Sequence, residues 1–347
     1  MSLTIPSPLV SIILVVWNSA VHLPRCLESL SSQTFRNFEV ILVDNGSKDG
    51  SLDGVENRWP GLALHLEKLD ENKGFAIANN LGARLARGQW LAMLNTDAFP
   101  EPDWLEKLLR AAGDYPEFSF FASRQLQANA PHLLDGAGDV LHISGLAWRR
   151  YAGFPAAQFG LKTEEVFSPC AAAALYSRRA FLQLGGFDED FFSYHEDIDL
   201  GFRLRLQGFR CLYVSDAVVH HIGSATLGPQ SDFALYHWQR NFIWSFVQNM
   251  PSALLWEALP SHLMANFIYQ VNYSLRGRGS LLLKAKKDAL RGLSRALRKR
   301  REVQKIRKVA GVGLLRIMER GWLHPYLLGY HIRKIERAMQ PSGKPSL

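Results

Sequence analysis

Polar side chains that could bind a ligand follow three predicted strands, at the point where each strand ends. Unbroken runs of β-branched and aliphatic residues predict buried strands at 9–16, 38–43 and 90–94. The residues that follow these strands are Trp17-Asn18, Asp44-Asn45 and Asn95-Thr96-Asp97. Because parallel strands end at the same edge of a sheet, we expect these side chains to form one binding edge.

A pair of adjacent acids, Glu196 and Asp197, is the second feature that could do chemistry. A carboxylate placed beside a reacting hydroxyl can accept its proton as a general base. The pair also begins a predicted helix, so stabilising that helix N-terminus is the alternative role. Asp199 is expected to pair with Arg203, one helical turn later. His221 could bind a metal ion or a phosphate, or lie hydrogen-bonded in the core.

The elements that must position these residues alternate between strand and helix. Helical spacing of apolar or small residues predicts helices near 23–30, 75–87, 103–112, 178–184 and 198–207. Shorter strands are expected at 169–176 and 211–214, and residues 119–166, rich in Gly, Ala and aromatics, are expected to form a loop over the site. The alternation predicts an α/β fold with a mostly parallel central sheet flanked by helices.

The last third of the chain differs in composition and charge. Residues 242–275 are aromatic and apolar but contain Pro251 and Pro260, which predicts short helices lying on a surface. Residues 281–309 are predicted to form one long basic helix, with apolar residues roughly on one side at Leu282, Leu290, Leu293, Leu297 and Ile306. Fourteen Lys or Arg and only two acids lie between Arg276 and Lys308, whereas the rest of the chain has 26 basic and 30 acidic residues.

This basic stretch predicts attraction to something anionic, such as lipid headgroups or nucleic acid. Aromatic residues are not interleaved with it as stacking platforms, so nucleic acid is not expected as a partner. An anionic membrane surface is the predicted partner instead. The alternative is a solvated basic helix that packs on its own protein.

Composition excludes several classes of protein. The chain is 47% hydrophobic and 21% charged, as in ordinary globular domains. Its three cysteines lie far apart, which suits neither a disulfide framework nor a CxxC metal site and points to a reducing compartment. Neither a signal peptide nor a membrane-spanning helix is expected. A dinucleotide-binding GxGxxG after the first strand and a P-loop signature are both absent.

Five ordered segments of the sequence resemble glycosyltransferase family 2, which has the GT-A fold. They are VSIILVVWN, VILVDNGSKDGS, ENKGFAIANNLGARLARGQWLAMLNTDA, GGFDEDFFSYHEDIDLGFRLRLQGFR and AVVHHIGSAT. The last two resemble the bacterial rhamnosyltransferase-type branch of the family, and the whole resemblance covers about residues 9–245. It implies transfer of a sugar from a nucleotide diphosphate to an acceptor hydroxyl.

For the donor, the resemblance implies nucleotide-binding side chains at the strand ends. Asp44 is the expected partner of the pyrimidine N–H or a ribose hydroxyl, and Trp17 and Asn18 would stack on or bond to the nucleoside. Asp49 is a further candidate for the same task. The remaining donor-binding candidates are Asn45, Asn72, Gly74 and Asn95. Turn formation is the alternative role for these Asp, Asn and Gly residues.

The resemblance also implies a divalent metal, Mg²⁺ or Mn²⁺. Asp97 matches the final aspartate of the DxD motif, whereas Asn95 replaces its first acid. The metal would then be held by Asp97, donor phosphates and His221, since a hard cation prefers carboxylate and phosphate oxygens. His220 is expected to be structural.

For the reaction itself, the resemblance selects Asp197 as the base and leaves Glu196 to position the loop. Attack by the acceptor hydroxyl in a single displacement would invert the anomeric configuration. Ala171 stands where the family usually has glycine and is expected to narrow the donor pocket. Arg240-Asn241 resembles the family's RN pair. Four aromatic residues could line the acceptor pocket or form core, namely Phe187, Phe191, Phe192 and Tyr194.

The predicted donor is dTDP-L-rhamnose, with a UDP-hexose second, and the predicted acceptor is a cell-surface glycan or lipid-linked glycan. We expect a GT-A catalytic domain at 1–235, with donor binding at 1–97 and the acceptor side and base at 98–235. A helical, basic region follows at 236–347. The predicted location is cytoplasmic, at the inner face of the cytoplasmic membrane.

Three other functions are compatible with parts of the sequence. A sugar nucleotidyltransferase would need a Gly-rich, Arg- and Lys-containing loop after the first strand, where this chain has WNSAVHL. A non-catalytic membrane- or nucleic-acid-binding protein would explain the basic stretch but not the ordered acids at strand ends. A catalytically inactive GT-A module would bind a nucleotide sugar without turning it over.

Overall fold

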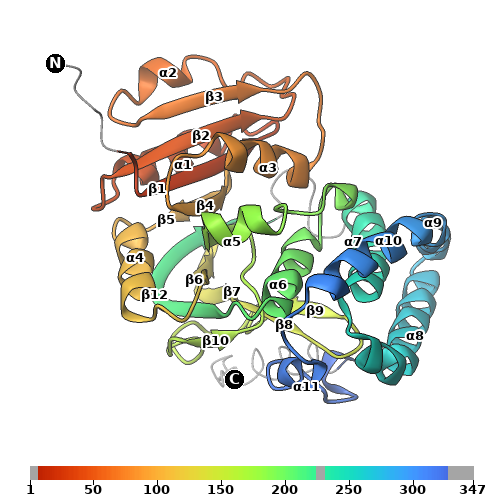
Figure 1. The fold of residues 1–347 in the computed structure, drawn as a ribbon. Helices are drawn as coiled ribbons and strands as arrows, with labels where there is room; N and C mark the ends of the chain where they lie inside the picture. Colours follow the sequence, from red (N-terminus) through yellow and green to blue (C-terminus); the bar gives the residue numbers. More distant parts are fainter. Residues whose placement is uncertain (1–6, 224–230, 327–347) are drawn as a thin grey trace, which may run out of the picture.

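The computed structural model describes residues 7–223 and 231–326, which form a layered α/β unit followed by a helical region (Figure 1). The N-terminal strands and the C-terminal helices lie on different sides of the molecule. The end of the AVVHHIGSAT segment and parts of both predicted domains lie outside the described ranges.

The described residues form a ten-stranded sheet whose N-terminal half is parallel. Four strands pair in the order β4-β1-β2-β3. They are β1 (Val10–Val16), β2 (Phe38–Asp44), β3 (Leu64–Lys68) and β4 (Trp90–Asn95). Val16 lies beside Asp44 and Val15 beside Asn95, so the three predicted strand ends do meet at one edge.

The other half of the sheet is mixed. From β4 the order continues through β11, β6, β12 and β10; β11 is antiparallel to both of its neighbours, and β12 is parallel to β6. β5 pairs with β12, β7 pairs with β6, and β8 and β9 form a separate pair. The bounds are β5 (Ala98–Pro100), β6 (Phe120–Gln127), β7 (Ala130–Ala137), β8 (Asp139–Leu141), β9 (Ala147–Arg149), β10 (Glu164–Val166), β11 (Ala173–Ser177) and β12 (Cys211–His221).

The prediction of a loop at residues 119–166 is therefore wrong. This segment contains β6, an interior strand of the sheet, where Phe120, Phe121 and Ala122 are fully buried or nearly so. Its partners β11 and β12 lie far along the chain, so the local sequence carries little sign of the pairing.

The helices predicted from leucine and alanine spacing are present and cover both faces of the sheet (Figure 1). Ile12 and Leu14 pack in a core with α1 and α4, whereas Ile13 packs on the opposite face with α3. A side chain at Gly82 of α3 would lie 2.6 Å from Ile13, which explains the small residues of this helix. The bounds are α1 (Leu23–Ser31), α2 (Val55–Arg58), α3 (Phe75–Leu85), α4 (Trp104–Asp114), α5 (Arg178–Gln183), the 3₁₀ turn η1 (Glu189–Phe191) and α6 (Glu196–Leu206).

The C-terminal region contains longer helices than the prolines predicted. Pro251 does separate α7 from α8, but Pro260 lies inside α8. Pro260 lacks the backbone N–H that would have bonded the carbonyl oxygen of Trp256. This part of the helix is exposed to solvent, so water can replace that hydrogen bond. The bounds are α7 (Asp232–Asn249), α8 (Ser252–Leu275), α9 (Gly279–Arg291), α10 (Leu293–Ile306) and α11 (Gly311–Leu314).

The prediction of one basic helix at 281–309 is also wrong, because the segment forms two helices that meet at Gly292. The indole of Trp244 packs so closely there that a side chain at Gly292 would lie 2.3 Å from it. The prediction that the leucines of this segment share one apolar side is also wrong. Leu282 is fully buried in the protein, whereas Leu290 is exposed.

Within residues 7–223 and 231–326, no helix is both long and apolar enough to cross a membrane.

Candidate active site

A cavity of about 380 Å³ lies at the carboxyl edge of β1, β2 and β4, where α6 begins and α7 passes by. Eight of the predicted site residues line it: Trp17, Asn45, Asn72, Asn95, Asp97, Glu196, Asp197 and His221. The other four, Asn18, Asp44, Asp49 and Gly74, do not line the cavity. The geometry thus brings the donor, metal and base candidates together around one space.

Three of the four residues outside the cavity hold the loops beside it. Asp44 accepts a hydrogen bond from the Ser47 N–H (2.9 Å), and Asn18 accepts one from the Lys48 N–H (2.9 Å). Asp49 accepts one from the Ala20 N–H (2.9 Å). These are the turn-forming contacts that the alternative role anticipated.

Asn45, Asn72 and Gly74 link the donor side to the segment that precedes α6. The Asn45 amide donates to Asn72 Oδ1 (2.9 Å), and the same Oδ1 accepts from the Gly74 N–H (2.9 Å). Gly74 has φ 92°, and a side chain there would lie 2.6 Å from the carbonyl oxygen of Phe192. Glycine is therefore required for this close approach.

His221 connects Asp97 to two residues that the sequence analysis missed. Its Nε2 lies 3.3 Å from Asp97 Oδ1, and its Nδ1 lies 2.7 Å from Asp135 Oδ2, which also pairs with Arg149. Burial alone would lower the pKa of His221, but the hydrogen bonds to Asp135 and Asp97 outweigh it and raise that pKa. A carboxylate on Nδ1 fixes the ring so that Nε2 faces Asp97.

This arrangement fits a divalent cation held partly by protein and partly by a ligand. Asp97 Oδ1 and His221 Nε2 face each other at the cavity wall, and both atoms are suitable metal ligands. Among the described residues, no three His, Cys, Asp or Glu side chains form a complete metal cluster. A cation at this place would need further oxygens, which the phosphates of a donor can supply.

The acid pair lines the same cavity at the start of α6. Asp197 accepts hydrogen bonds from the N–H groups of Ala171 (3.2 Å) and Ile198 (2.8 Å). Burial raises the pKa of Asp197, and these N–H donors, with the charge of Arg149, offset this only in part. Burial, followed by the charge of Asp197, raises the pKa of Glu196 well above its usual value. Both acids therefore hold a proton more readily than free carboxyls do.

Asp199 stabilises the packing of α6 and does not line the cavity, as predicted. It is fully buried and bonds Arg203 Nε (2.7 Å) and the Asn249 amide (2.7 Å). The Arg203 guanidinium also donates to the carbonyl oxygen of Gly186 (2.8 Å), which fixes the glycine turn before η1.

The segment between η1 and α6 has an unusual backbone that α7 holds in place. Phe192, Tyr194 and His195 have φ values of 66°, 68° and 71°, a region that side chains other than glycine rarely adopt. The Asn241 amide donates to the carbonyls of Phe191 (3.0 Å), Ser193 and Tyr194 (2.7 Å). Asn241 of the RN pair therefore holds the backbone of the segment before α6, a role that the sequence chemistry alone did not indicate.

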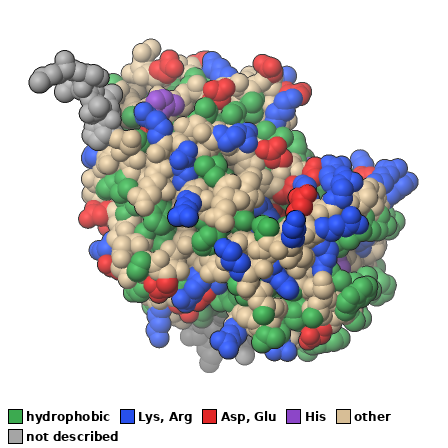
Figure 2. Space-filling model, viewed as in Figure 1, with side chains coloured by type: hydrophobic (Ala, Val, Ile, Leu, Met, Phe, Trp, Pro, Cys, Tyr) green, Lys and Arg blue, Asp and Glu red, His purple; other side chains and the backbone are tan. Residues whose placement is uncertain are grey.

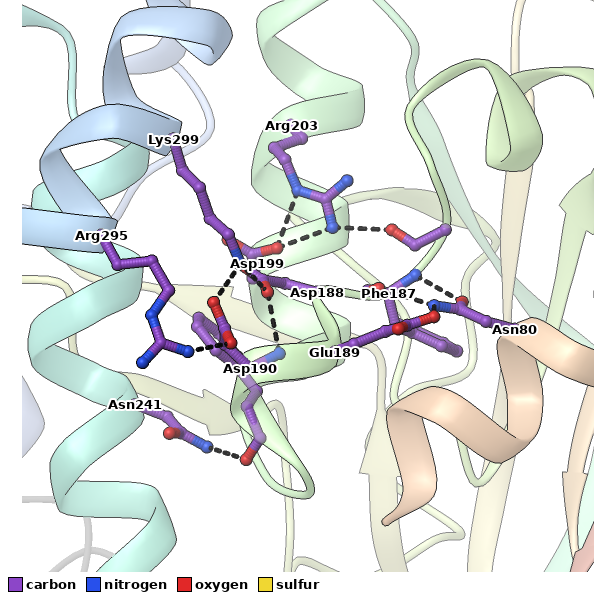
Figure 3. A network of polar contacts seen from close by, with 12 residues as sticks. Asn80, Phe187, Asp188, Glu189, Asp190, Asp199, Arg203, Asn241, Arg295 and Lys299 are labelled. Carbon is purple, nitrogen blue, oxygen red and sulfur yellow. Dashed lines mark hydrogen bonds and ion pairs between the residues drawn. The ribbon is translucent and has the colours of Figure 1, made fainter. Parts of the chain in front are cut away.

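Two cations of α10 hold η1 itself (Figure 3). Lys299 Nζ lies between Asp188, which it contacts closely, and Asp190 Oδ2 (2.6 Å). Arg295 pairs with the other oxygen of Asp190. The basic segment therefore packs partly on its own protein, and it supports the loop that leads into the acid pair.

The predicted aromatic cluster divides into two groups. Phe187 and Phe191 are buried in the core, whereas Phe192 and Tyr194 line the cavity. Further aromatic residues line the same side from segments without a recognisable motif: Trp148, Phe233 and Trp238. His220 lies near Glu101 and does not line the cavity, in agreement with a structural role.

Comparison with known proteins identifies the family of this chain. Residues 11–185 match the model of the family "Glycosyl transferase family 2", and this chain belongs to that family. It is 31% identical over 254 residues to N-acetylglucosaminyl-diphospho-decaprenol L-rhamnosyltransferase of Mycobacterium tuberculosis, covering 65% of this chain and 80% of that relative. It is therefore a rhamnosyltransferase-like glycosyltransferase.

Other comparisons cover less of the relative. EpsH of Bacillus subtilis is 37% identical over 116 residues, which is 31% of this chain and 31% of EpsH. The crystal structure of GalNAc-T7 with UDP, GalNAc and Mn²⁺ superposes with a TM-score of 0.58 and 17% identity, over 71% of this chain and 49% of that one. This likeness shows the fold, which is of the GT-A type as predicted.

Proposed function

We propose that this glycosyltransferase moves one sugar from a nucleoside diphosphate donor to a hydroxyl of a glycan acceptor, with inversion at the anomeric carbon. The observation that carries the proposal is that Asp97 with His221, and Glu196 with Asp197, open into the same cavity. Sugar transfer needs both groups at once, one to stabilise the leaving diphosphate and one to take the acceptor proton.

The donor lies across the strand ends in this proposal. Trp17, Asn45, Asn72 and Asn95 contact the nucleotide directly because they line the cavity. Asn18, Asp44, Asp49 and Gly74 act by shaping the loops around it. The donor is dTDP-L-rhamnose, supported by the name of the mycobacterial relative, and a UDP-hexose is the second choice.

Asp97 and His221 hold a divalent cation, Mg²⁺ or Mn²⁺, together with the donor phosphates. When bound, such a cation neutralises charge that develops on the leaving diphosphate. Asp135 keeps the imidazole oriented, and Arg149 in turn pairs with Asp135. The Mn²⁺ named with GalNAc-T7 supports the choice of metal.

Asp197 removes the proton of the acceptor hydroxyl while the oxygen attacks the anomeric carbon from the side opposite the diphosphate. The N–H donors of Ala171 and Ile198 fix the direction of the carboxylate. Glu196 is buried next to it and positions the start of α6. A single displacement of this kind inverts the anomeric configuration.

The acceptor is a growing cell-surface glycan, carried on a lipid. The diphospho-decaprenol in the name of the mycobacterial relative supports this choice. The enzyme then works in the cytoplasm at the inner face of the membrane, with an anionic membrane surface as its third partner. The exposed cations among the fourteen basic residues between Arg276 and Lys308 favour that partner, whereas Arg295 and Lys299 pair with Asp188 and Asp190.

A panel of nucleotide sugars tests the proposal. The purified protein is incubated with each sugar, an acceptor glycan and Mg²⁺ or Mn²⁺, and nucleoside diphosphate release is followed. Release from one donor, dependent on the acceptor and abolished by EDTA, is expected. Tight donor binding without release under any condition would identify an inactive binding module instead.

A further inference from the structure

Helix α8 exposes apolar side chains on the face that a surface helix normally makes polar. Its 24 residues contain a single charged side chain, Glu257. Leu254, Ala258, His262 and Ala265 are buried against the protein. A helix that is apolar all round normally lies in a core or against another apolar phase.

The exposed apolar residues lie along one side of the helix, here named the α8 stripe, with the exposed Ser274 among them and the exposed Glu257 at the edge. They recur at spacings of one, three, four or seven residues and fall within about 120° of the helix circumference, over a length of about 28 Å. The members and their exposed fractions are Trp256 (71%), Leu263 (59%), Met264 (47%), Phe267 (64%), Val271 (41%) and Leu275 (84%). Single exposed apolar residues are ordinary, but a contiguous row marks an interaction surface.

Cations flank the stripe on the neighbouring helix. Lys286 of α9 donates to the carbonyl oxygen of Asn266 of α8 (2.8 Å), so the two helices lie side by side. Four exposed cations follow the end of α8: Arg276, Lys284, Lys287 and Arg291. Figure 2 shows Lys and Arg side chains gathered over α9 and α10, with hydrophobic side chains gathered beside them over α8.

We infer that the α8 stripe and its flanking cations bind the surface of an anionic lipid bilayer, with α8 lying in the plane of the interface. The membrane contact predicted from sequence is thereby moved from residues 281–309 to α8, because Leu282 is buried in the protein. An apolar row supplies burial among acyl chains, and adjacent Lys and Arg supply attraction to anionic headgroups.

A second copy of this chain fits the same surface less well. A symmetric dimer formed through the stripe would bring the same face of both copies together. The cations of α9 would then meet the identical cations of the partner, with only Glu257 and Asp288 as acids on these helices to balance them. An anionic bilayer complements both the apolar row and the charge.

The stripe lies one helix away from the acceptor side of the cavity. Trp238 lines the cavity and packs against Tyr269 of α8, with ring centroids 4.9 Å apart. A bilayer at α8 would therefore be close to the place where an acceptor enters. This consequence rests on the proposed lipid-linked acceptor, whereas vesicle binding itself does not.

Co-sedimentation with vesicles tests the inference. Vesicles of phosphatidylglycerol and phosphatidylcholine are used, at low and high salt, with the full chain. A variant carrying Trp256→Gln, Phe267→Gln and Leu275→Gln should bind at least about tenfold more weakly than wild type. The matched control, Leu85→Gln with Leu161→Gln, changes exposed leucines elsewhere and should bind as wild type does. Lys284→Gln with Lys287→Gln should remove much of the salt dependence.

Wild-type protein that remains in the supernatant with anionic vesicles at low salt would overturn the inference, as would equal binding of the α8 variant. Light scattering measures the oligomeric state as a second test. If wild type is a dimer that the α8 substitutions convert to a monomer, with no vesicle binding by either, the stripe joins two copies. Nucleoside diphosphate release with a water-soluble acceptor, measured without vesicles, should be unchanged in the α8 variant, so that failure of docking and failure of catalysis are separate results.

Discussion

The two sides of the cavity are held in different ways. On the proposed donor side, Trp17, Asn45 and Asn95 come directly from the ends of three neighbouring strands. Asn45 is held by Asn72, and the Asn95 N–H donates to the carbonyl oxygen of Ala172 on the loop before β11, so these contacts come from the sheet and its loops and not from the C-terminal helices. On the acceptor side, the loop before Glu196 and Asp197 has a strained backbone that α7 and α10 hold from far along the chain.

Because the two sides are held differently, we expect substitutions to affect donor binding and catalysis separately. The donor edge is part of a rigid parallel sheet, so its shape does not depend on the C-terminal helices. The base loop depends on contacts such as those of Asn241 and Lys299 with the segment from Asp188 to Tyr194. Changes in the C-terminal region should therefore affect turnover more than donor affinity.

The largest effect is expected from the base. Asp197→Asn keeps the size of the side chain and one of its two hydrogen bonds from the Ala171 and Ile198 N–H groups, but it cannot accept a proton. It should bind the donor as wild type does and lose about 10²–10⁴ in turnover. Glu196→Gln, the matched variant, should lose less. Turnover and calorimetric donor binding measure the two effects, and a dead Glu196→Gln beside an active Asp197→Asn would reverse the assignment.

The next largest effect concerns the metal. Asp97→Ala removes the carboxylate that faces His221 and should remove most activity, by about 10²-fold or more, while the fold remains intact. Asp135→Asn should weaken activation by Mn²⁺ about 10–100-fold, because Asp135 orients the imidazole of His221 without lining the cavity itself. Asp114→Ala, at an exposed aspartate of α4, is the control. Full activity in EDTA would show that no cation is needed.

The strand-end residues could be identified from sequence because their signal is local, and the acid pair could be identified because its segment resembles that of the family. A buried parallel strand is a continuous apolar run, and the polar residues that end it follow at once. Asp135, Arg149 and Lys299 carried no such signal. Asp135 lies on β7, and it meets His221 because β6 pairs with both β7 and the distant strand β12. Arg149 lies on β9, and Lys299 reaches the loop through the packing of α10 on η1. No local pattern predicts these contacts.

In the helical region, too, local sequence patterns did not predict contacts between distant residues. Pro260 predicted a helix break and the basic run predicted one continuous helix, but α8 continues through Pro260 and the basic run breaks at Gly292. Trp244, a residue of a different helix, packs so closely on Gly292 that only glycine fits there. Surface helices were predicted at 242–275, but the sequence did not show which side chains of α8 are exposed, because that depends on how α8 packs on the protein.

The acid pair also predicts a pH dependence on the acceptor side. Burial raises the pKa of Asp197 above the value of 3.8 usual for aspartate. Because the base must be ionised, turnover should fall as the pH falls through this raised pKa, by about tenfold per unit. Asp197→Asn should lose this acid limb from its residual rate, and donor affinity should change less. A rate that is constant down to pH 4 would contradict the assignment.

The smallest effect is expected from the support of the base loop. Lys299→Met removes the cation between Asp188 and Asp190, and turnover should fall about tenfold through misplacement of the loop, with donor KM unchanged. Lys299→Arg should restore part of the rate. Lys305→Met, at an exposed lysine of the same helix, is the control. An equal loss of donor affinity would show that the two sides are not held separately.

The anomeric configuration of the product tests the central claim most directly. Asp197 as a base requires a single displacement, in which the acceptor oxygen enters opposite the leaving diphosphate. Proton NMR of the freshly formed product, made with the donor that the nucleotide-sugar panel identifies, measures the configuration at the transferred sugar. The account predicts that it is inverted relative to the donor. A product of retained configuration would contradict it.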